Sequence, residues 1–163
     1  MNILFLDYDG VVNRAMWEKR ENGEWVCRYN FPADNCVNDT QAVQWLSEFC
    51  QKYDYSIVIT STWRSESNYR ECLINAGLRP GIQILGRTEW SDRSRLEQIR
   101  RYLQSVDHVE AVLIVDDDPV ALHSPLFIQC DPNNGFTIDT FNEARTTHEA
   151  FAGGGMLHEI ARL

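Results

Sequence analysis

Five short apolar runs recur along the chain, separated by longer stretches with helical spacing, and this alternation limits the fold more than any other feature. The runs cover residues 2–6, 56–60, 82–85, 111–115 and 126–129. Near-continuous apolar runs suit a parallel sheet that is covered on both faces. The pattern therefore predicts a doubly wound, Rossmann-like α/β fold, with about five parallel strands and helices on both faces.

Three segments predict the covering helices: residues 38–53, 65–77 and 92–106. Apolar side chains recur at helical spacing in the first and third segments, and the second ends on a glycine suited to a C-terminal cap. Asn38 and Asp39 are alternative N-caps for the first helix, because both side chains can accept hydrogen bonds from the orphan main-chain amides there.

Residues 14–36 interrupt this alternation. The Asn22-Gly23 pair, flanked by segments with strand character, predicts a β-hairpin before the first long helix. The hairpin carries aromatic side chains that either pair across it and against the body or stack on the base of a substrate. These aromatic residues are Trp17, Trp25, Tyr29 and Phe31.

Length, composition and charge narrow the class of protein. A chain of 163 residues fits a single domain, 1–163, in which "GGG" at 153–155 opens a possible tail helix over 153–163. No apolar stretch is long enough for a membrane span, and the first residues lack a signal-peptide pattern. Five scattered cysteines without a CxxC pair favour reduced thiols in a cytoplasmic protein. A net charge of −9 disfavours capture of long nucleic acid.

Polar side chains follow three of the predicted strands. Asp7 and Asp9 follow the first strand, hydroxyl groups at 60–62 follow the second, and acidic groups at 116–118 follow the fourth. Ligands of open α/β sheets bind at the carboxyl ends of the strands, so these groups should share one site. Crowded carboxylates repel one another unless a hard cation joins them, and Mg²⁺ is the expected ion. The chemistry that follows is attack by an aspartate on a metal-held phosphate, while the second aspartate moves protons.

Four motifs carry a resemblance to a known family. "FLDYDGVV" resembles the DxDGV signature of the haloacid dehalogenase (HAD) superfamily, whose members are mostly phosphatases. "ITSTWR", the helix opening "RLEQI" and "LIVDDDP" match its other three motifs in order, so the resemblance spans about residues 3–135. The hairpin matches the superfamily's flap, and no large cap domain is visible. "STWR", "RLEQI" and "CDPNNGFT" are similar to small capless HAD domains associated with RNA-repair proteins, such as polynucleotide 3′-phosphatases.

The resemblance implies a role for each residue of the first motif. Asp7 would be the nucleophile that forms an aspartyl-phosphate, and it would also bind Mg²⁺. Asp9 would be the general acid and base, with its main-chain carbonyl facing the metal. Gly10 would let the chain turn beside the phosphate. The alternative is that these residues only form a turn.

The second and third motifs supply the phosphate-binding groups. Ser61 is the preferred hydroxyl for a phosphoryl oxygen, and Thr60 is its competitor. Arg64 either faces the phosphate or pairs with an acid on the surface. Arg95 takes the place where the superfamily usually has a lysine, and its planar fork differs from a lysine's point charge. The alternative for Arg95 is an exposed helix residue.

Asp116 and Asp117 complete the expected metal site. Together these residues predict a Mg²⁺-dependent phosphohydrolase acting on a phosphomonoester, with a nucleotide or a polynucleotide 3′-phosphate among the candidate substrates. We expect the protein to act on phosphorylated partners, namely nucleic-acid ends, phosphoproteins or phosphorylated metabolites, and not to bind membranes. A catalytically weak module that binds Mg²⁺ and a phosphorylated partner is the alternative function.

Overall fold

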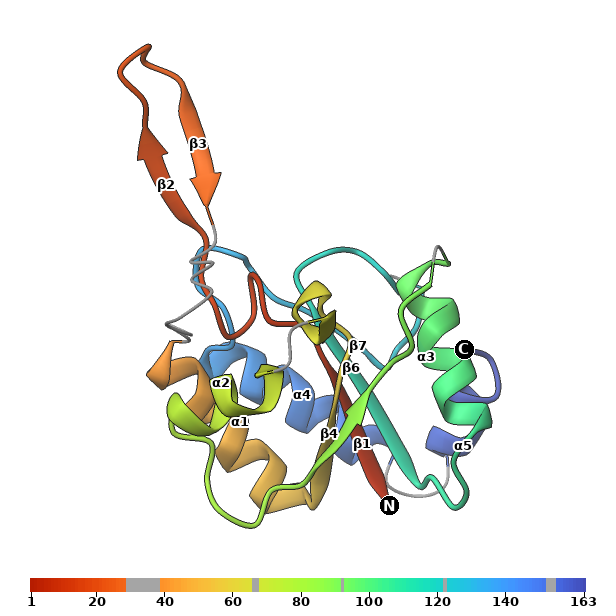
Figure 1. Ribbon diagram of the computed structural model, residues 1–163. Coiled ribbons are helices and arrows are strands. Elements are labelled where there is room, and N and C mark those ends of the chain that lie inside the picture. The colour runs from red at the N-terminus through yellow and green to blue at the C-terminus, as the bar shows by residue number, and fades with distance from the viewer. Residues whose placement is uncertain (29–38, 66–67, 92, 122, 152–154) are drawn as a thin grey trace.

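A computed structural model places five parallel strands in one sheet, in the order β5-β4-β1-β6-β7 (Figure 1). It describes residues 1–28, 39–65, 68–91, 93–121, 123–151 and 155–163. The strands are β1 (Asn2–Leu6), β4 (Tyr55–Ile59), β5 (Ile84–Arg87), β6 (Ala111–Asp116) and β7 (Phe127–Gln129). The first strand thus lies at the centre of the sheet. The next two strands of the sheet along the chain, β4 and β5, lie on one side of it, and the last two, β6 and β7, lie on the other. The predicted α/β fold is confirmed.

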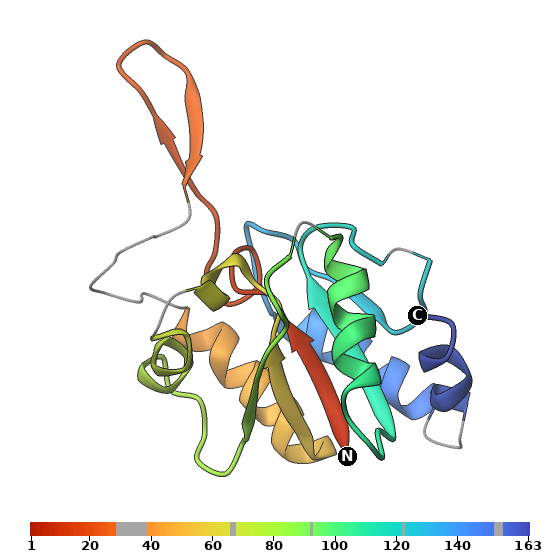
Figure 2. The same ribbon diagram turned by 45° about the vertical axis from the view of Figure 1, so that its right-hand side comes forward.

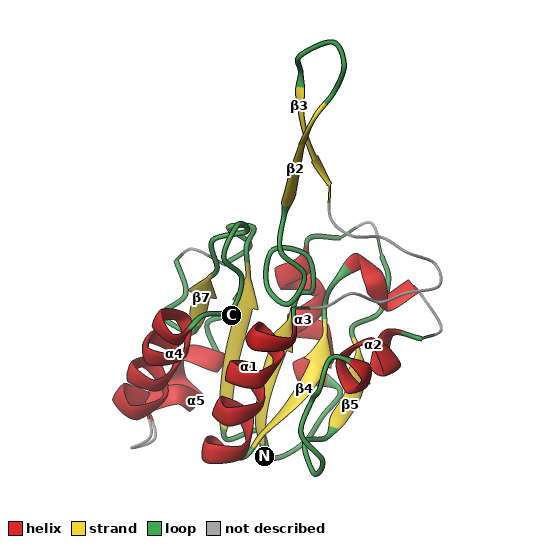
Figure 3. Cartoon of the chain, turned by 90° about the vertical axis from the view of Figure 1, so that its left-hand side faces the viewer, coloured by secondary structure: helices red, strands yellow, loops and turns green. Residues whose placement is uncertain are grey.

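The central strands form the core because both of their faces are covered. Ile3, Leu4, Phe5 and Leu6 of β1 are all fully buried, and every residue of β6 is buried as well. This explains why the two runs are continuously apolar rather than alternating. Figure 3 shows that helices lie in front of the sheet and behind it.

The helices divide between the two faces of the sheet. α1 and α4 share one face, where the Phe49 and Phe141 rings meet edge to face at 5.8 Å. α3 and α5 lie on the opposite face (Figure 1). The helix bounds are α1 (Thr40–Tyr53), α2 (Tyr69–Asn75), α3 (Arg95–Gln104), α4 (Ile138–Phe151) and α5 (Gly155–Ile160), with a 3₁₀ turn η1 over Thr62–Ser65.

The predicted hairpin is present as β2 (Met16–Lys19) and β3 (Trp25–Arg28), which pair antiparallel. It extends away from the α/β body, on the side of the sheet where the strands have their carboxyl ends (Figures 1 and 2). The Trp25 side chain is 59% exposed and lies against Lys19 rather than against the body. The expected packing on the body is therefore wrong for Trp25. Tyr29 and Phe31 lie outside the described residues.

Several element bounds differ from those predicted. The third sheet strand is shifted from 82–85 to Ile84–Arg87, and the second long helix is shortened from 65–77 to Tyr69–Asn75. Helix α4 was not predicted at all. Asp39 is the N-cap of α1, while the competing Asn38 lies outside the described residues.

Two further sequence expectations concern the membrane and the cysteines. Within the described residues, no helix combines the length and apolarity that a membrane crossing requires. Cys50 and Cys130 are buried free thiols, as expected. Cys72 is disulfide-bonded, so the expectation of reduced thiols throughout is wrong at this position.

Candidate active site

Main-chain hydrogen bonds bring three strand ends together. The Asp7 amide donates to the Val115 carbonyl at 3.0 Å, which extends the ladder between β1 and β6 by one residue. The Thr60 amide donates to the Leu6 carbonyl at 2.8 Å on the other side of β1. The residues that follow β1, β4 and β6 therefore start from neighbouring points at one edge of the sheet.

Three carboxylates gather at this edge. Asp7, Asp116 and Asp117 each offer an oxygen, and these oxygens all lie within 4.8 Å of one another. Asp7 and Asp116 are buried, and Asp7 Oδ1 accepts no hydrogen bond from any described residue. Three crowded carboxylates repel one another, and a hard cation with oxygen ligands is the usual compensation. This set of side chains fits a divalent cation such as Mg²⁺.

Arg95 lies against two of these carboxylates. It is the first residue of α3, after the N-cap Ser94, whose hydroxyl accepts from the Glu97 amide at 3.3 Å. Its Nη1 lies 3.3 Å from Asp7 Oδ1 and forms an ion pair with Asp116 Oδ2. The predicted alternative, an exposed helix residue, is excluded by this position.

Burial sets the electrostatics of the cluster. It raises the pKa of Asp7, against the lowering effects of the Arg95 charge and of a hydrogen bond with the Ser61 side chain. Burial and the neighbouring Asp7 charge likewise raise the pKa of Asp116, and Arg95 opposes them. The carboxylates are thus destabilised as anions unless a cation is near, and Arg95 supplies only part of that compensation.

Asp9 has a separate environment two residues further on. Its carboxylate accepts hydrogen bonds from Trp63 Nε1 at 3.0 Å and from Asn13 Nδ2 at 2.8 Å. Burial raises the pKa of Asp9, while these two hydrogen bonds lower it. A carboxyl group with a raised pKa is suited to general acid catalysis. The Asp9 side chain is not one of the three clustered carboxylates, so its expected contact with a metal, through the main-chain carbonyl, stays a prediction.

Gly10 allows the chain to turn back next to the cluster. Its φ is +73°, a conformation that L residues rarely adopt. A Cβ at this position would lie 2.3 Å from Cγ of Asp117. Glycine is therefore required both by the main-chain conformation and by the packing of a candidate metal ligand.

The two competing hydroxyl groups have different partners. Ser61 is fully buried, forms the hydrogen bond with Asp7, and accepts from the Trp63 amide at 3.3 Å. Thr60 is equally buried, but its Oγ1 has no hydrogen-bond partner among the described residues. Ser61 is the hydroxyl in contact with the proposed nucleophile.

Sequence reasoning gave no role to two of the residues that shape the site and misplaced a third. Trp63 and Asn13 hold Asp9, and the only signal for Trp63 was its place in "STWR", two residues after Ser61. The expected pairing of Arg64 with a surface acid is wrong, and its expected contact with a phosphate stays a prediction. Arg64 is buried, and it donates to the Thr60 and Ser61 carbonyls and to Gln98 Oε1 because the η1 turn directs it inward.

Comparison with known protein families gives a match over most of the chain. The family described as "HAD domain in Swiss Army Knife RNA repair proteins" matches residues 3–141, which include every residue discussed above. A search of curated proteins found no match.

Proposed function

Because the chain belongs to the family of HAD domains in Swiss Army Knife RNA repair proteins, we propose that it is a Mg²⁺-dependent phosphohydrolase that uses Asp7 as its nucleophile. The observation that carries the proposal is the environment of Asp7. This buried carboxylate lies between Arg95 and Ser61, beside Asp116 at the end of β6 and Asp117 directly after it. Arg95 offsets one of the three negative charges, and the remaining two match a divalent cation.

The side chains divide the reaction between them. An oxygen of Asp7 attacks phosphorus, the bond from phosphorus to the leaving oxygen breaks, and Asp9 gives that oxygen a proton. Asp9 then takes a proton from water as the water oxygen attacks phosphorus, and the bond to Asp7 breaks. Ser61 donates to a phosphoryl oxygen, and Arg95 neutralises part of its charge.

The metal would be held by Asp7, Asp116, Asp117 and the main-chain carbonyl of Asp9. When bound, Mg²⁺ supplies positive charge against the phosphoryl oxygens. The substrate we propose is a phosphomonoester on a nucleotide or a polynucleotide 3′ end, in keeping with the RNA-repair proteins named in the family description.

Release of inorganic phosphate tests this function. The panel contains an aryl phosphate, nucleoside 3′- and 5′-monophosphates, a 3′-phosphorylated RNA and a phosphotyrosine peptide, each with Mg²⁺ and with chelator. Asp7→Asn should lower kcat by about 10³-fold or more, the scale on which loss of a nucleophile acts in other hydrolases. Asp107→Asn is the matched control, because Asp107 is exposed and precedes β6 at the opposite edge of the sheet. Release that survives Asp7→Asn contradicts the assignment.

One observation favours a second function, a module that binds Mg²⁺ and a phosphorylated partner without turnover. Arg95 contacts Asp7 and Asp116 together, and so competes with a metal for both carboxylates. A folded protein that binds Mg²⁺ in calorimetry and releases no phosphate from any substrate would support this second function over hydrolysis.

A further inference from the structure

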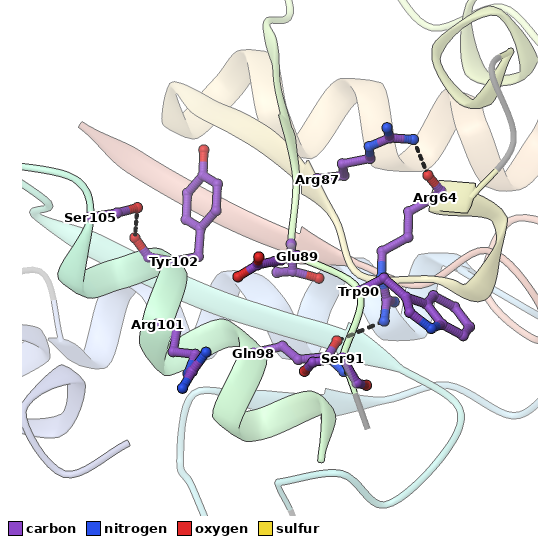
Figure 4. A pocket seen from close by; sticks show the side chains of 10 residues that line it. Arg64, Arg87, Glu89, Trp90, Ser91, Gln98, Arg101, Tyr102 and Ser105 are labelled. Carbon is purple, nitrogen blue, oxygen red and sulfur yellow. Dashed lines mark hydrogen bonds between the residues drawn. The ribbon is translucent and has the colours of Figure 1, made fainter. Parts of the chain in front are cut away.

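Trp90 is the largest apolar side chain exposed near the candidate active site. It lies in the segment between β5 and α3 and is 61% exposed. An exposed indole presents a flat apolar face on which a ligand ring can stack. Figure 4 shows Trp90 at the wall of a cavity of about 540 Å³, within the usual size range of small-molecule sites.

The ring is supported from beneath by a fixed cation. The Arg64 guanidinium lies over one face of Trp90, with Cζ 4.9 Å from the ring centroid. Gln98 Oε1 accepts from Arg64 Nη2 at 2.7 Å (Figure 4). The Ser61 carbonyl accepts from Arg64 Nη1 at 2.9 Å. The indole thus packs on a residue of the η1 turn, which directly follows Ser61.

A second cavity adjoins the one beside Trp90. It has about 280 Å³, shares Arg64, Trp90, Ser91 and Gln98 with the first, and is also lined by Arg95. Because Arg95 Nη1 lies 3.3 Å from Asp7 Oδ1, Trp90 lines a cavity whose wall includes a direct neighbour of the proposed nucleophile.

Arginines dominate the lining of the two cavities. Five arginines stand against the acids Glu89 and Asp118, although the whole chain carries a net charge of −9. Arg95 is paired with Asp7 and Asp116 and Arg64 is buried, so the exposed Arg87 and Arg101 are the ones placed to meet a ligand. Arg101 has no acidic partner among the described residues, whereas Arg93 pairs with Glu97. The arginines are Arg64, Arg87, Arg93, Arg95 and Arg101. Arginine and an aromatic ring together are the groups that bind single-stranded nucleic acid.

We propose that Trp90 is a specificity-determining residue that stacks on the nucleobase next to the scissile phosphate, while the surrounding arginines attract the phosphates of the same strand. This inference rests on the proposed phosphohydrolase function. It adds which part of the substrate the protein recognises, namely the nucleobase next to the phosphate. A mononucleotide and the end of an oligonucleotide both offer such a base, and the experiment separates these two sources.

The first measurement compares substrates with and without a base. Values of kcat/KM are determined for a nucleoside 3′-monophosphate, a hexaribonucleotide 3′-phosphate and β-glycerophosphate. Trp90→Ala should lower the ratio of nucleotide to β-glycerophosphate kcat/KM by about tenfold, mainly through KM, which is the effect of losing one stacked base. Trp90→Phe should recover part of the loss, because a phenyl ring still stacks. A larger effect on the hexanucleotide than on the mononucleotide would assign the arginines to further phosphates of the strand.

The control is the other strongly exposed indole. Trp25→Ala removes a side chain of similar exposure from the hairpin, and it should change the ratio by less than about twofold. An unchanged ratio in Trp90→Ala, or a loss found in Trp25→Ala instead, would overturn the proposal and point to a partner-binding role for Trp90.

A binding measurement separates this inference from the proposed function. If the wild type releases phosphate from none of the three substrates, hydrolysis fails, and the subsite is then judged by equilibrium binding alone. Asp7→Asn and the double variant Asp7→Asn/Trp90→Ala are titrated with the hexaribonucleotide 3′-phosphate and with inorganic phosphate. Stacking predicts about tenfold weaker binding of the oligonucleotide in the double variant and little change for phosphate. Equal oligonucleotide affinities overturn it.

Discussion

At Gly10 the main chain adopts a positive φ while the Asp117 carboxylate occupies the space that a side chain would need. The residue thus determines where a candidate metal ligand lies without touching the metal itself. Groups that orient ligands typically change metal affinity by about 10- to 100-fold when they are altered.

We expect Gly10→Ala to weaken Mg²⁺ binding by about tenfold, because the new methyl group displaces Asp117. Isothermal titration calorimetry measures the affinity. Gly23→Ala is a matched control, since Gly23 has a φ of +83° but nothing within 4 Å of an added Cβ. Unaltered Mg²⁺ affinity in Gly10→Ala would show that Asp117 is not a ligand.

Site residues at the ends of strands could be predicted from the sequence, whereas those on the turn after β4 could not. Asp7 and Asp116 could be predicted to meet because each follows an apolar run, and parallel strands present their carboxyl ends at one edge. Trp63 and Arg64 could not, because their directions depend on a single 3₁₀ turn. The indole of Trp63 reaches Asp9, and Arg64 turns inward beneath Trp90.

Secondary-structure elements were predicted where an apolar stripe or run was strong. Helix α4 was missed because only Thr140, Phe141 and Ala144 of its residues are buried, so its stripe is short and partly polar. Strand β5 begins later than predicted, at Ile84, where its pairing with Ile57 of β4 starts, and that pairing shifts register between Ile57 and Val58. Register of this kind is decided by the neighbouring strand and leaves no local sequence signal.

Asp39 stabilises the start of helix α1 and also links it to Arg14, in the segment that follows β1. The Asp39 carboxylate caps the helix by accepting from the Gln41 amide at 2.8 Å, and it also forms an ion pair with Arg14. Asp39→Ala should lower the free energy of unfolding by about 1 kcal/mol through the lost cap. Asp39→Asn should lower it by less, because asparagine also caps and the partner Arg14 is half exposed.

Urea unfolding followed by circular dichroism gives both values for Asp39. Equal losses in the two variants would mean that the ion pair, rather than the cap, provides the stabilisation.

At the scale of the whole molecule, His148 of α4 contacts both the C-terminal end of α1 and the start of β4. His148 Nδ1 lies 3.1 Å from the Tyr55 hydroxyl, and its ring lies 4.6 Å from that of Tyr53, centroid to centroid. Burial lowers the pKa of His148, although the nearby Glu149 charge opposes this. The folded protein therefore binds a proton at His148 less readily than the unfolded chain does.

This difference predicts a pH dependence of stability. A lowered folded pKa means that the unfolded chain gains protons first, so stability falls as the pH drops below the ordinary histidine value of about 6.5. The loss continues until the pH passes the folded pKa. In His148→Gln, which cannot titrate, this contribution should be absent.

Urea unfolding of both proteins between about pH 8 and pH 5 measures the effect. The advantage of the wild type over the variant should shrink as the pH falls. A constant difference across that range would contradict the burial of His148.

The ion pairs of Arg95 also determine the formal charge of the candidate site. Three carboxylates and one guanidinium leave two negative charges, which a single divalent ion neutralises. A phosphate dianion would then approach a centre with no net charge, so long-range attraction from the centre itself is weak. Capture of the substrate would depend on directional hydrogen bonds and on charges placed farther out, such as those of Arg87 and Arg101 in the cavity beside Trp90.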